Sequence, residues 1–309
     1  MVELRVEYGA VQLGLGQARP RLSWVADGRP GEAQTAYELA RRLDGQILSG
    51  GRVEGADSLW LDWPFEPLAS RQAVELRLRL WGEGPEPGPW SDWRSIEAGL
   101  LEPTDWSVPW VVVDQRDEDQ SGPGPAYRAR TEFSWSGSGP ARLYLTGHGL
   151  VDVELNGRAV SDELLAPGWT SYRHRVVYRA LDVSQSLQPG ANAIGVTVAD
   201  GWYRGKLGFN GGASRATYGS DLAFLLQLEA VDPAGPRALI GPAATWKVAP
   251  SPVVSAGLYE GEVIEAGLIE PDWSRAGFDD QAWRPARTVP LDGLPGRPVA
   301  ATLPPIRVT

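Results

Sequence analysis

The stretch AVELRLRLW, residues 73–81, alternates apolar and charged side chains. In an extended chain one face carries only aliphatic side chains, namely Val74, Leu76, Leu78 and Leu80. The opposite face carries Glu75, Arg77 and Arg79. A period of two is that of a β-strand with one buried face. The stretch therefore predicts a strand that packs on a hydrophobic core.

The same period recurs along the chain, in ARLYLTG (141–147), VDVELNG (151–157), NAIGVTVA (192–199) and DLAFLLQLEAV (221–231). Asn156-Gly157 is a strong signal for a two-residue hairpin turn. No stretch of helical length carries an apolar stripe, and the chain has 37 Gly and 26 Pro. These features predict an all-β protein. Because the turn signals are irregularly spaced, sandwiches are favoured over barrels.

Turn-rich and polar segments divide the 309 residues into three regions. Residues 1–101 have the length of an immunoglobulin-like or fibronectin type III sandwich, and residues 102–258 form a second unit. The third region, 259–309, is too short to bury a core of its own. It either completes the sandwich that begins near Trp106 or leads into a further β-sandwich domain of a longer chain.

Composition excludes several classes of function. The net charge of −10 opposes binding to nucleic acid or to anionic membranes. With no cysteine, the chain has no disulfide, thiolate metal site or cysteine nucleophile, which fits a reducing compartment. The charged N-terminal stretch 1–16 does not read as a signal peptide, and no apolar run is long enough to span a membrane. We expect a soluble protein, with the cytoplasm favoured and secretion possible if an export signal has been removed.

Tryptophan is unusually frequent, with 14 Trp against 5 Phe. Its large ring packs well between β-sheets, and it is also a common platform for the apolar face of a sugar ring. Composition alone leaves both roles open.

Several stretches together resemble the N-terminal, non-catalytic part of bacterial α-L-rhamnosidases of glycoside hydrolase family 78. The central segment, residues 149–205, is similar to that family's N-terminal module in the order and spacing of ELNG, LAPGWTSY, GANAIGV and DGWYRG. The flanking stretches are PRLSW (20–24), WSDW (90–93), LYEGEVIEA (258–266) and LPPIRV (303–308). The resemblance covers essentially the whole chain, but GEVIEAGL (261–268) departs from the family's usual Tyr-Asp-Ala-Arg run.

The resemblance implies an immunoglobulin or fibronectin type III-like sandwich followed by a jelly-roll, galactose-binding-like β-sandwich. In some relatives this jelly roll holds L-rhamnose through a bound calcium ion. The family's catalytic part is an (α/α)6 barrel C-terminal to these units. This chain has no helical repeat. We therefore expect no catalytic residues here.

Five residues are candidates for carbohydrate binding: Trp169, Asp200, Trp202, Tyr203 and Arg204. Trp169 or Trp202 would stack on a sugar ring, and Asp200 would accept hydrogen bonds from its hydroxyls. The alternative is that Trp169 closes the core, that Asp200 caps a turn and that Arg204 is solvated or meets a neighbouring domain.

Asp162, Glu163 and Asn210 are candidate calcium ligands, since calcium binds hard oxygen donors. Asp162 could instead cap a turn. The two histidines, His148 and His174, lack a second histidine at metal spacing, which argues against a zinc site or a Ser-His-Asp triad.

The sequence leaves three alternative functions open. The first is a non-catalytic fragment of an α-L-rhamnosidase that binds L-rhamnose or a rhamnosyl glycan, with Ca²⁺, and joins a C-terminal catalytic domain. The second is a purely structural pair of domains bracing that barrel. The third is a stand-alone glycosidase, which would need two carboxyl groups across one cleft.

Overall fold

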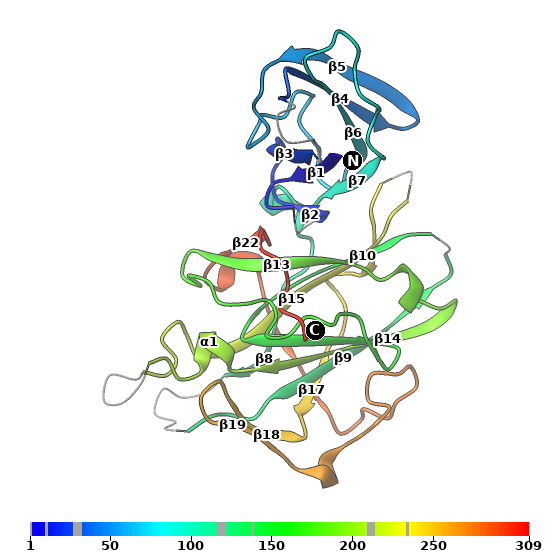
Figure 1. Ribbon diagram of the computed structural model, residues 1–309. Coiled ribbons are helices and arrows are strands. Elements are labelled where there is room, and N and C mark those ends of the chain that lie inside the picture. Colours follow the sequence, from blue (N-terminus) through cyan, green and yellow to red (C-terminus); the bar gives the residue numbers. More distant parts are fainter. Residues whose placement is uncertain are drawn as a thin grey trace. The chain divides into compact units, whose positions relative to one another are not determined.

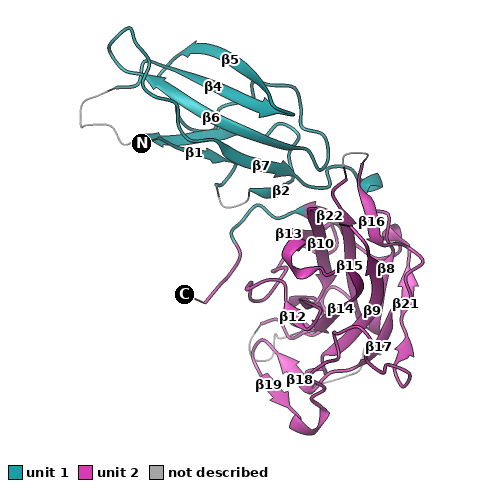
Figure 2. Ribbon diagram, turned by 90° about the vertical axis from the view of Figure 1, so that its right-hand side faces the viewer, with its two compact units in different colours: residues 1–105, 300–304 teal, residues 106–299, 305–309 magenta. Residues whose placement is uncertain are grey.

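The computed structural model describes residues 2–9, 12–26, 33–115, 122–137, 139–208, 214–232 and 235–308. They form two compact units, one of residues 1–105 with 300–304 and one of residues 106–299 with 305–309 (Figure 2). Both units are built from β-strands, which confirms the predicted all-β sandwich class (Figure 1).

The first unit holds a five-stranded sheet and a two-stranded sheet. The larger sheet has the order β2 (Leu13–Leu15), β7 (Arg94–Ala98), β6 (Ala73–Trp81), β4 (Ala36–Leu43) and β5 (Gln46–Glu54). The smaller sheet pairs β1 (Val2–Val6) with β3 (Leu22–Ala26). A 3-10 turn, η1 (Pro103–Asp105), ends the unit's long segment.

The predicted strand 73–81 is β6, and Val74, Leu76 and Leu78 are buried as its alternation requires. They join the core around Trp24 and Trp63. Towards the end of the strand the pattern changes. Leu80 is only partly buried, whereas Trp81, on the opposite face, is buried beneath arginine side chains.

The second unit is a sandwich of two large sheets. One has the order β21 (Arg287–Val289), β8 (Trp110–Gln115), β15 (Asp221–Ala230), β10 (Ala141–His148), β13 (Arg175–Asp182) and β22 (Arg297–Ala300), with β16 (Arg237–Ile240) paired to β15. The other has the order β12 (Arg158–Ala159), β11 (Leu150–Leu155), β14 (Gly190–Ala199), β9 (Tyr127–Trp135), β17 (Lys247–Pro250) and β20 (Arg284–Pro285).

Among the described residues of this unit, the smaller elements are a hairpin, three 3-10 turns and one helical turn. The hairpin pairs β18 (Val253–Gly257) with β19 (Gly261–Ile264). The 3-10 turns are η2 (Ser184–Ser186), η4 (Ala266–Leu268) and η5 (Leu291–Gly293), and the helix is α1 (Gly201–Arg204). No helix among the described residues is long and apolar enough to cross a membrane.

The core of the second unit is formed by apolar side chains from both large sheets, including Val153, Val196 and Phe224. Asn156 and Gly157 have φ angles of 53° and 79° and join β11 to β12. This two-residue turn is the one that their sequence predicts, because its backbone needs positive φ at both positions.

The predicted division at 101/102 falls four residues before the boundary between the compact units. The region 259–309 is not a separate body. Its strands β20 and β21 pair with β17 and β8, so it completes the sandwich that begins at Trp106. Residues 300–304 belong to the first unit, where a Cβ on Gly16 would lie 2.8 Å from the Cβ of Ala300, and Ala301 is buried.

Most tryptophans serve as packing residues. Nine of the fourteen are buried, namely Trp24, Trp63, Trp81, Trp106, Trp110, Trp135, Trp246, Trp273 and Trp283. Trp60 and Trp169 are exposed, and the other three are partly buried.

Candidate functional site

The DGWYRG stretch begins where β14 ends and forms the helical turn α1. Its first residue, Asp200, is 1% exposed. Arg204 donates from Nε to Asp200 Oδ1 at 2.8 Å and from Nη1 to Asp114 Oδ2 at 2.8 Å. The backbone N–H of Gly124 donates to Asp200 Oδ2 at 3.1 Å. Buried charges need such partners, and these bonds fix α1 to the end of the sheet.

Gly201 allows the chain to leave β14 sharply. Its φ of +50° favours glycine, and a Cβ there would lie 2.7 Å from the Cγ of Leu150. The backbone of α1 therefore packs directly on β11. This contact, together with the ion pairs of Arg204, determines where the next side chains, Trp202 and Tyr203, point.

Beneath α1 lies a stack of buried rings. The His148 imidazole lies between the rings of Trp110 and Tyr203, with centroid distances of 4.7 and 4.3 Å. Its Nε2 lies 3.0 Å from the Pro295 carbonyl oxygen, so the neutral ring donates there. Burial lowers the pKa of His148 to about 4, and burial raises the pKa of Tyr203 to about 12. Both rings are therefore uncharged at neutral pH, and His148 serves in packing.

Three aromatic residues of this region, Trp169, Trp202 and Tyr218, reach the surface. Trp169 is 59% exposed, and its ring is parallel to that of Trp202, with an interplanar angle of 2° and centroids 6.5 Å apart. Trp169 Nε1 donates to the hydroxyl of Tyr218 at 3.2 Å. We call Trp169, Trp202 and Tyr218 the Trp169 platform. Tyr172 supports it, since its ring packs on Tyr218 and its hydroxyl donates to the Gly168 carbonyl at 3.1 Å.

The five candidate sugar-binding residues thus separate into two groups. Trp169 and Trp202 lie together with accessible ring surface. The side chains of Asp200, Tyr203 and Arg204 are buried, where a sugar ring has no access. In this structure these three side chains contact protein groups. Tyr218 was not predicted, because nothing in its sequence context marks it as a partner of Trp169.

The candidate calcium ligands are not assembled by the described residues. Asp162 Oδ1 accepts a hydrogen bond from Arg307 Nε at 2.6 Å, and Glu163 Oε1 accepts one from Arg179 Nη2 at 2.6 Å. Asn210 lies outside the described residues. Across the described chain, no cluster of three or more acidic, His or Cys side chains could hold a metal ion. Each of these two carboxylates thus faces a guanidinium, and calcium binding by this chain stays a prediction.

Comparisons with known proteins agree with the resemblance read from the sequence. A family model described as the α-L-rhamnosidase N-terminal domain matches residues 139–309. A second, described as the Rha78A-like N-terminal immunoglobulin domain, matches residues 1–102. Of the two sandwich types expected for the first unit, the comparison supports the immunoglobulin type.

Curated relatives and solved structures extend these matches. An α-L-rhamnosidase of Formosa agariphila is 31% identical over 268 residues, which are 81% of this chain and 28% of that protein. One of Streptomyces avermitilis is 43% identical over 168 residues, 54% of this chain and 16% of that protein. The native α-L-rhamnosidase structure from Aspergillus terreus has a TM-score of 0.86 and 34% identity, covering 97% of this chain and 36% of its own.

A Streptomyces avermitilis α-L-rhamnosidase structure, complexed with L-rhamnose, has a TM-score of 0.86 at 24% identity and covers 99% of this chain and 47% of its own. At that identity it supports the fold alone. The chain spans less than a third of the length of the two curated relatives named above. Since the α-L-rhamnosidase N-terminal model matches more than half of its residues, the chain belongs to the α-L-rhamnosidase family and is an N-terminal part of such a protein.

Proposed function

We propose that this chain is a non-catalytic, carbohydrate-binding part of an α-L-rhamnosidase, and that the Trp169 platform receives a terminal L-rhamnosyl ring. The hydrolysis of α-L-rhamnosyl groups would belong to a catalytic domain beyond this chain. The observation that carries the proposal is the large exposed surface of Trp169, parallel to the ring of Trp202.

The chemistry of the platform supports this assignment. Exposed indole rings stack on the C–H faces of pyranoses, and polar edges orient the ring through hydrogen bonds. The Tyr218 hydroxyl, already bonded to Trp169 Nε1, can donate its own proton to a sugar hydroxyl. A rigid base reduces the entropic cost of binding, and the buried pairs of Arg204 supply that base.

A catalytic role has less support. Glycoside hydrolysis needs two carboxyl groups about 5 to 10 Å apart across the scissile bond. The acidic residues closest to Trp169 in the sequence are Asp162 and Glu163. Each of them is paired with an arginine. The platform itself consists of two tryptophans and a tyrosine. It offers a binding surface without an acid or a base.

A structural role is the second candidate. It is favoured by the burial of Asp200, Tyr203 and Arg204, which bind protein rather than solvent. On this alternative the platform would be covered by protein in the longer chain and would bind no sugar.

Isothermal titration of this chain with L-rhamnose tests the proposal. We expect saturable binding that is lost in Trp169→Ala and retained in Trp60→Ala, which removes a second exposed tryptophan from the other unit. If the unaltered chain shows no heat of binding, the carbohydrate-binding proposal fails and the structural role remains. Repeating the titration with added calcium and after chelation tests the calcium prediction separately, since calcium-dependent affinity would require ligands beyond the two arginine-paired carboxylates.

A further inference from the structure

The two segments that build the Trp169 platform carry positive charge in an otherwise acidic chain. Residues 164–181 and 201–220 contain six Lys or Arg and no Asp or Glu, whereas the whole chain has a net charge of −10. The structure describes both segments except residues 209–213, whose sequence holds no charged side chain. Charges farther than about 8 Å away are largely screened at physiological ionic strength. The local excess of cations therefore decides which ligands the platform attracts.

Half of these six cations are neutralised inside the protein. Carboxylates hold three of the arginines, in the pairs Arg179–Glu163, Arg204–Asp200, Arg204–Asp114 and Arg215–Glu260. The other three, Arg173, Arg175 and Lys206, have no carboxylate within ion-pair distance in the described part of the chain. Arg173 and Arg175 are exposed, and Arg175 Nε donates to the hydroxyl of Thr170, the residue after Trp169, at 3.1 Å. An exposed guanidinium without a carboxylate is available to an oxyanion, which it can bind through two parallel N–H groups.

Arg173 lies beside the platform and not over its rings. Its Nη2 donates to the carbonyl oxygen of Thr217 at 3.0 Å. The next residue, Tyr218, accepts the hydrogen bond from Trp169 Nε1 at its hydroxyl. Because a guanidinium has five N–H donors, the bond to Thr217 leaves others for a ligand. A sugar ring stacked on Trp169 would therefore have this cation at its side, where the next unit of a glycan lies.

Lys206 approaches the platform from another segment. It follows the helical turn that carries Trp202, and it precedes Leu207. Leu207 and Ser214 exchange two backbone hydrogen bonds, of 2.8 and 3.0 Å. This pairing holds the backbone of Lys206 next to the segment that continues to Tyr218. The two unpaired cations thus come from both sides of the loop that supplies the platform.

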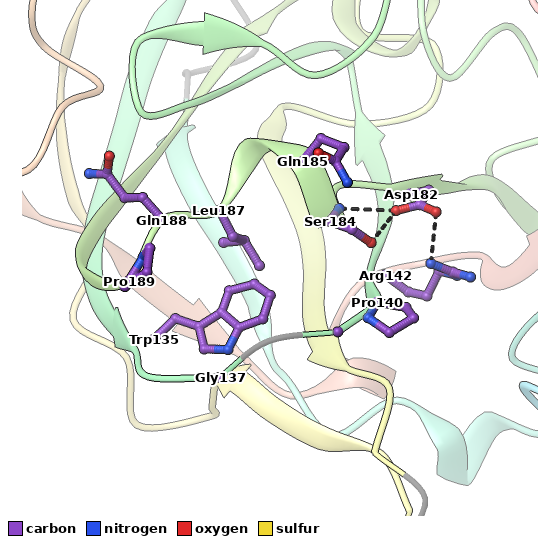
Figure 3. Close-up of a pocket in the computed structure, with 11 residues that line it drawn as sticks. Trp135, Gly137, Pro140, Arg142, Asp182, Ser184, Gln185, Leu187, Gln188 and Pro189 are labelled. Carbon is purple, nitrogen blue, oxygen red and sulfur yellow. Dashed lines mark hydrogen bonds and ion pairs between the residues drawn. The ribbon is translucent and has the colours of Figure 1, made fainter.

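A pocket in the same unit has the opposite arrangement (Figure 3). It has a volume of about 500 Å³ and lies between the segment that joins β9 to β10 and the segment that joins β13 to β14. Of its described lining residues, Arg142 is the cation, and its Nη1 lies 3.1 Å from Asp182 Oδ2. The indole of Trp135 is only 5% exposed. The described lining offers neither an accessible ring nor an unpaired cation, whereas the surroundings of the Trp169 platform offer both.

Given the sugar binding proposed above, on which this rests, we propose that the Trp169 platform takes acidic glycans, in which the unit next to the L-rhamnosyl ring carries a carboxylate or a sulfate group. The rhamnosyl ring stacks on Trp169, and Arg173 and Lys206 bind the oxyanion of the neighbouring unit. Exposed ion pairs are individually weak, so the oxyanion adds selectivity to the affinity that stacking supplies.

Titration calorimetry of the whole chain with matched disaccharides tests this. The acidic ligand is L-rhamnose linked α to D-glucuronate, and the neutral ligand is the same disaccharide with D-glucose. At low salt we expect the acidic ligand to bind about threefold to tenfold more tightly than the neutral one. High salt should remove the difference, because it screens exposed charges. A third disaccharide, with D-glucose 6-sulfate, distinguishes the two oxyanions, since the tighter of the two acidic ligands identifies the preferred group.

Single substitutions locate the preference. Arg173→Gln and Lys206→Gln should each reduce the preference for the acidic ligand by about twofold to threefold and leave the affinity for the neutral ligand unchanged. Arg158→Gln is the matched control, because Arg158 is exposed and has no ion pair among the described residues. It pairs with Leu155, at the other end of β11 from the residue that contacts Gly201.

The outcomes separate this proposal from the function on which it rests. If the acidic and neutral disaccharides bind equally well at low salt, the preference for acidic glycans is wrong and L-rhamnose binding at the platform stands. If neither these ligands nor methyl α-L-rhamnoside bind, both proposals fail. An acidic preference that survives both Arg173→Gln and Lys206→Gln also overturns this proposal, because the oxyanion would then bind elsewhere.

Discussion

Two surfaces of this protein display tryptophan in opposite ways. On one sheet of the first unit, tryptophans alternate with arginines in a ladder, whose members in order are Arg52, Trp81, Arg79, Trp90, Arg77, Trp93 and Arg42. Each guanidinium carbon lies 4.4–5.1 Å from a ring centroid. On the Trp169 platform, by contrast, no described lysine or arginine lies over a ring. Rings covered by cations contribute stability, whereas uncovered rings keep a face available for a ligand.

The acidic neighbours sharpen this contrast. In the ladder, Glu38 accepts a hydrogen bond from Arg79 Nε at 2.7 Å and Glu75 accepts one from Arg42 Nε at 2.5 Å. The arginines are thus held in place over the rings by both carboxylates and aromatic faces. At the platform the ionic partners lie below the rings, in the buried pairs of Arg204. These ion pairs hold the backbone beneath the platform and leave the faces of the Trp169 and Trp202 rings without a described cation over them.

The largest effect is expected when the buried support of the platform is broken. Arg204→Met leaves the carboxylate of Asp200, 1% exposed, without its cation. Loss of one partner of a buried pair lowers the free energy of unfolding by about 3–5 kcal/mol. Urea unfolding of the second unit, compared between the unaltered chain and Arg204→Met, measures this loss. Arg42→Met, in the exposed part of the ladder, is the control and should have a much smaller effect. A loss below about 1 kcal/mol for Arg204→Met would mean that water reaches Asp200 readily.

The second largest effect is expected from acid, which should lower the free energy of unfolding through His148 in the ring stack beneath the platform. The pKa of His148 is about 4 in the folded protein, below the ordinary value of 6.5, so the unfolded chain binds the proton more readily. The contribution of the neutral His148 imidazole to the free energy of unfolding is therefore fully present above pH 6.5. It is lost as the pH drops towards 4, which lowers the free energy of unfolding by about 3 kcal/mol in total at 1.36 kcal/mol per pKa unit.

Urea midpoints at several pH values, for the unaltered chain and for His148→Gln, measure this contribution. The difference between the two should shrink steadily between pH 7 and pH 4, because the variant has no imidazole to protonate. Parallel pH profiles for the two proteins would show that the imidazole takes up its proton without unfolding.

A smaller effect separates the two kinds of tryptophan directly. Trp90→Ala removes contacts with both Arg77 and Arg79, each worth about 0.5–1 kcal/mol, and should destabilise the first unit by about 1–2 kcal/mol without affecting sugar binding. Trp169→Ala should change stability by no more than about 0.5 kcal/mol while abolishing L-rhamnose binding at the platform. Calorimetric titration and urea unfolding of both variants give the comparison. Equal stability losses would remove the distinction between covered and uncovered rings.

The smallest effect is expected at the exposed rim of the ladder. Glu75→Gln removes one carboxylate that faces Arg42, and the Trp93 ring still holds the guanidinium, with its centroid 4.5 Å away. We expect an unchanged unfolding midpoint. A clear drop would indicate that the carboxylates, and not the rings, order the arginines.

Much of the fold could be predicted because it depends on local pattern. The alternation of residues 73–81 and the Asn156-Gly157 turn each encode their own conformation, and both occur as predicted. The position of Trp81 could not be predicted in this way. Its burial depends on Arg52 and Arg79, one of which lies on another strand.

The candidate site was predicted less completely, because partners far away in the sequence determine which of its residues are buried. Asp200 and Arg204 are four residues apart in a glycine-rich, exposed-looking stretch, but Asp114, 90 residues away, helps to hold Arg204 inside the protein. Asp162 likewise meets Arg307 at the far end of the chain. The sequence placed Trp169 and Trp202 in one candidate region, and their rings lie parallel to each other in the structure. Long-range pairing determined which of the other candidate residues are buried, and their role in sugar binding stays a prediction.

The return of residues 300–304 to the first unit affects how these domains can be exchanged between genes. Because Ala300 packs against Gly16 and Ala301 is buried, the immunoglobulin-like unit is not encoded by one continuous segment. A gene fragment that ends at codon 105 would omit these residues. Recombination at that boundary would therefore transfer an incomplete module, so the two units are best inherited together.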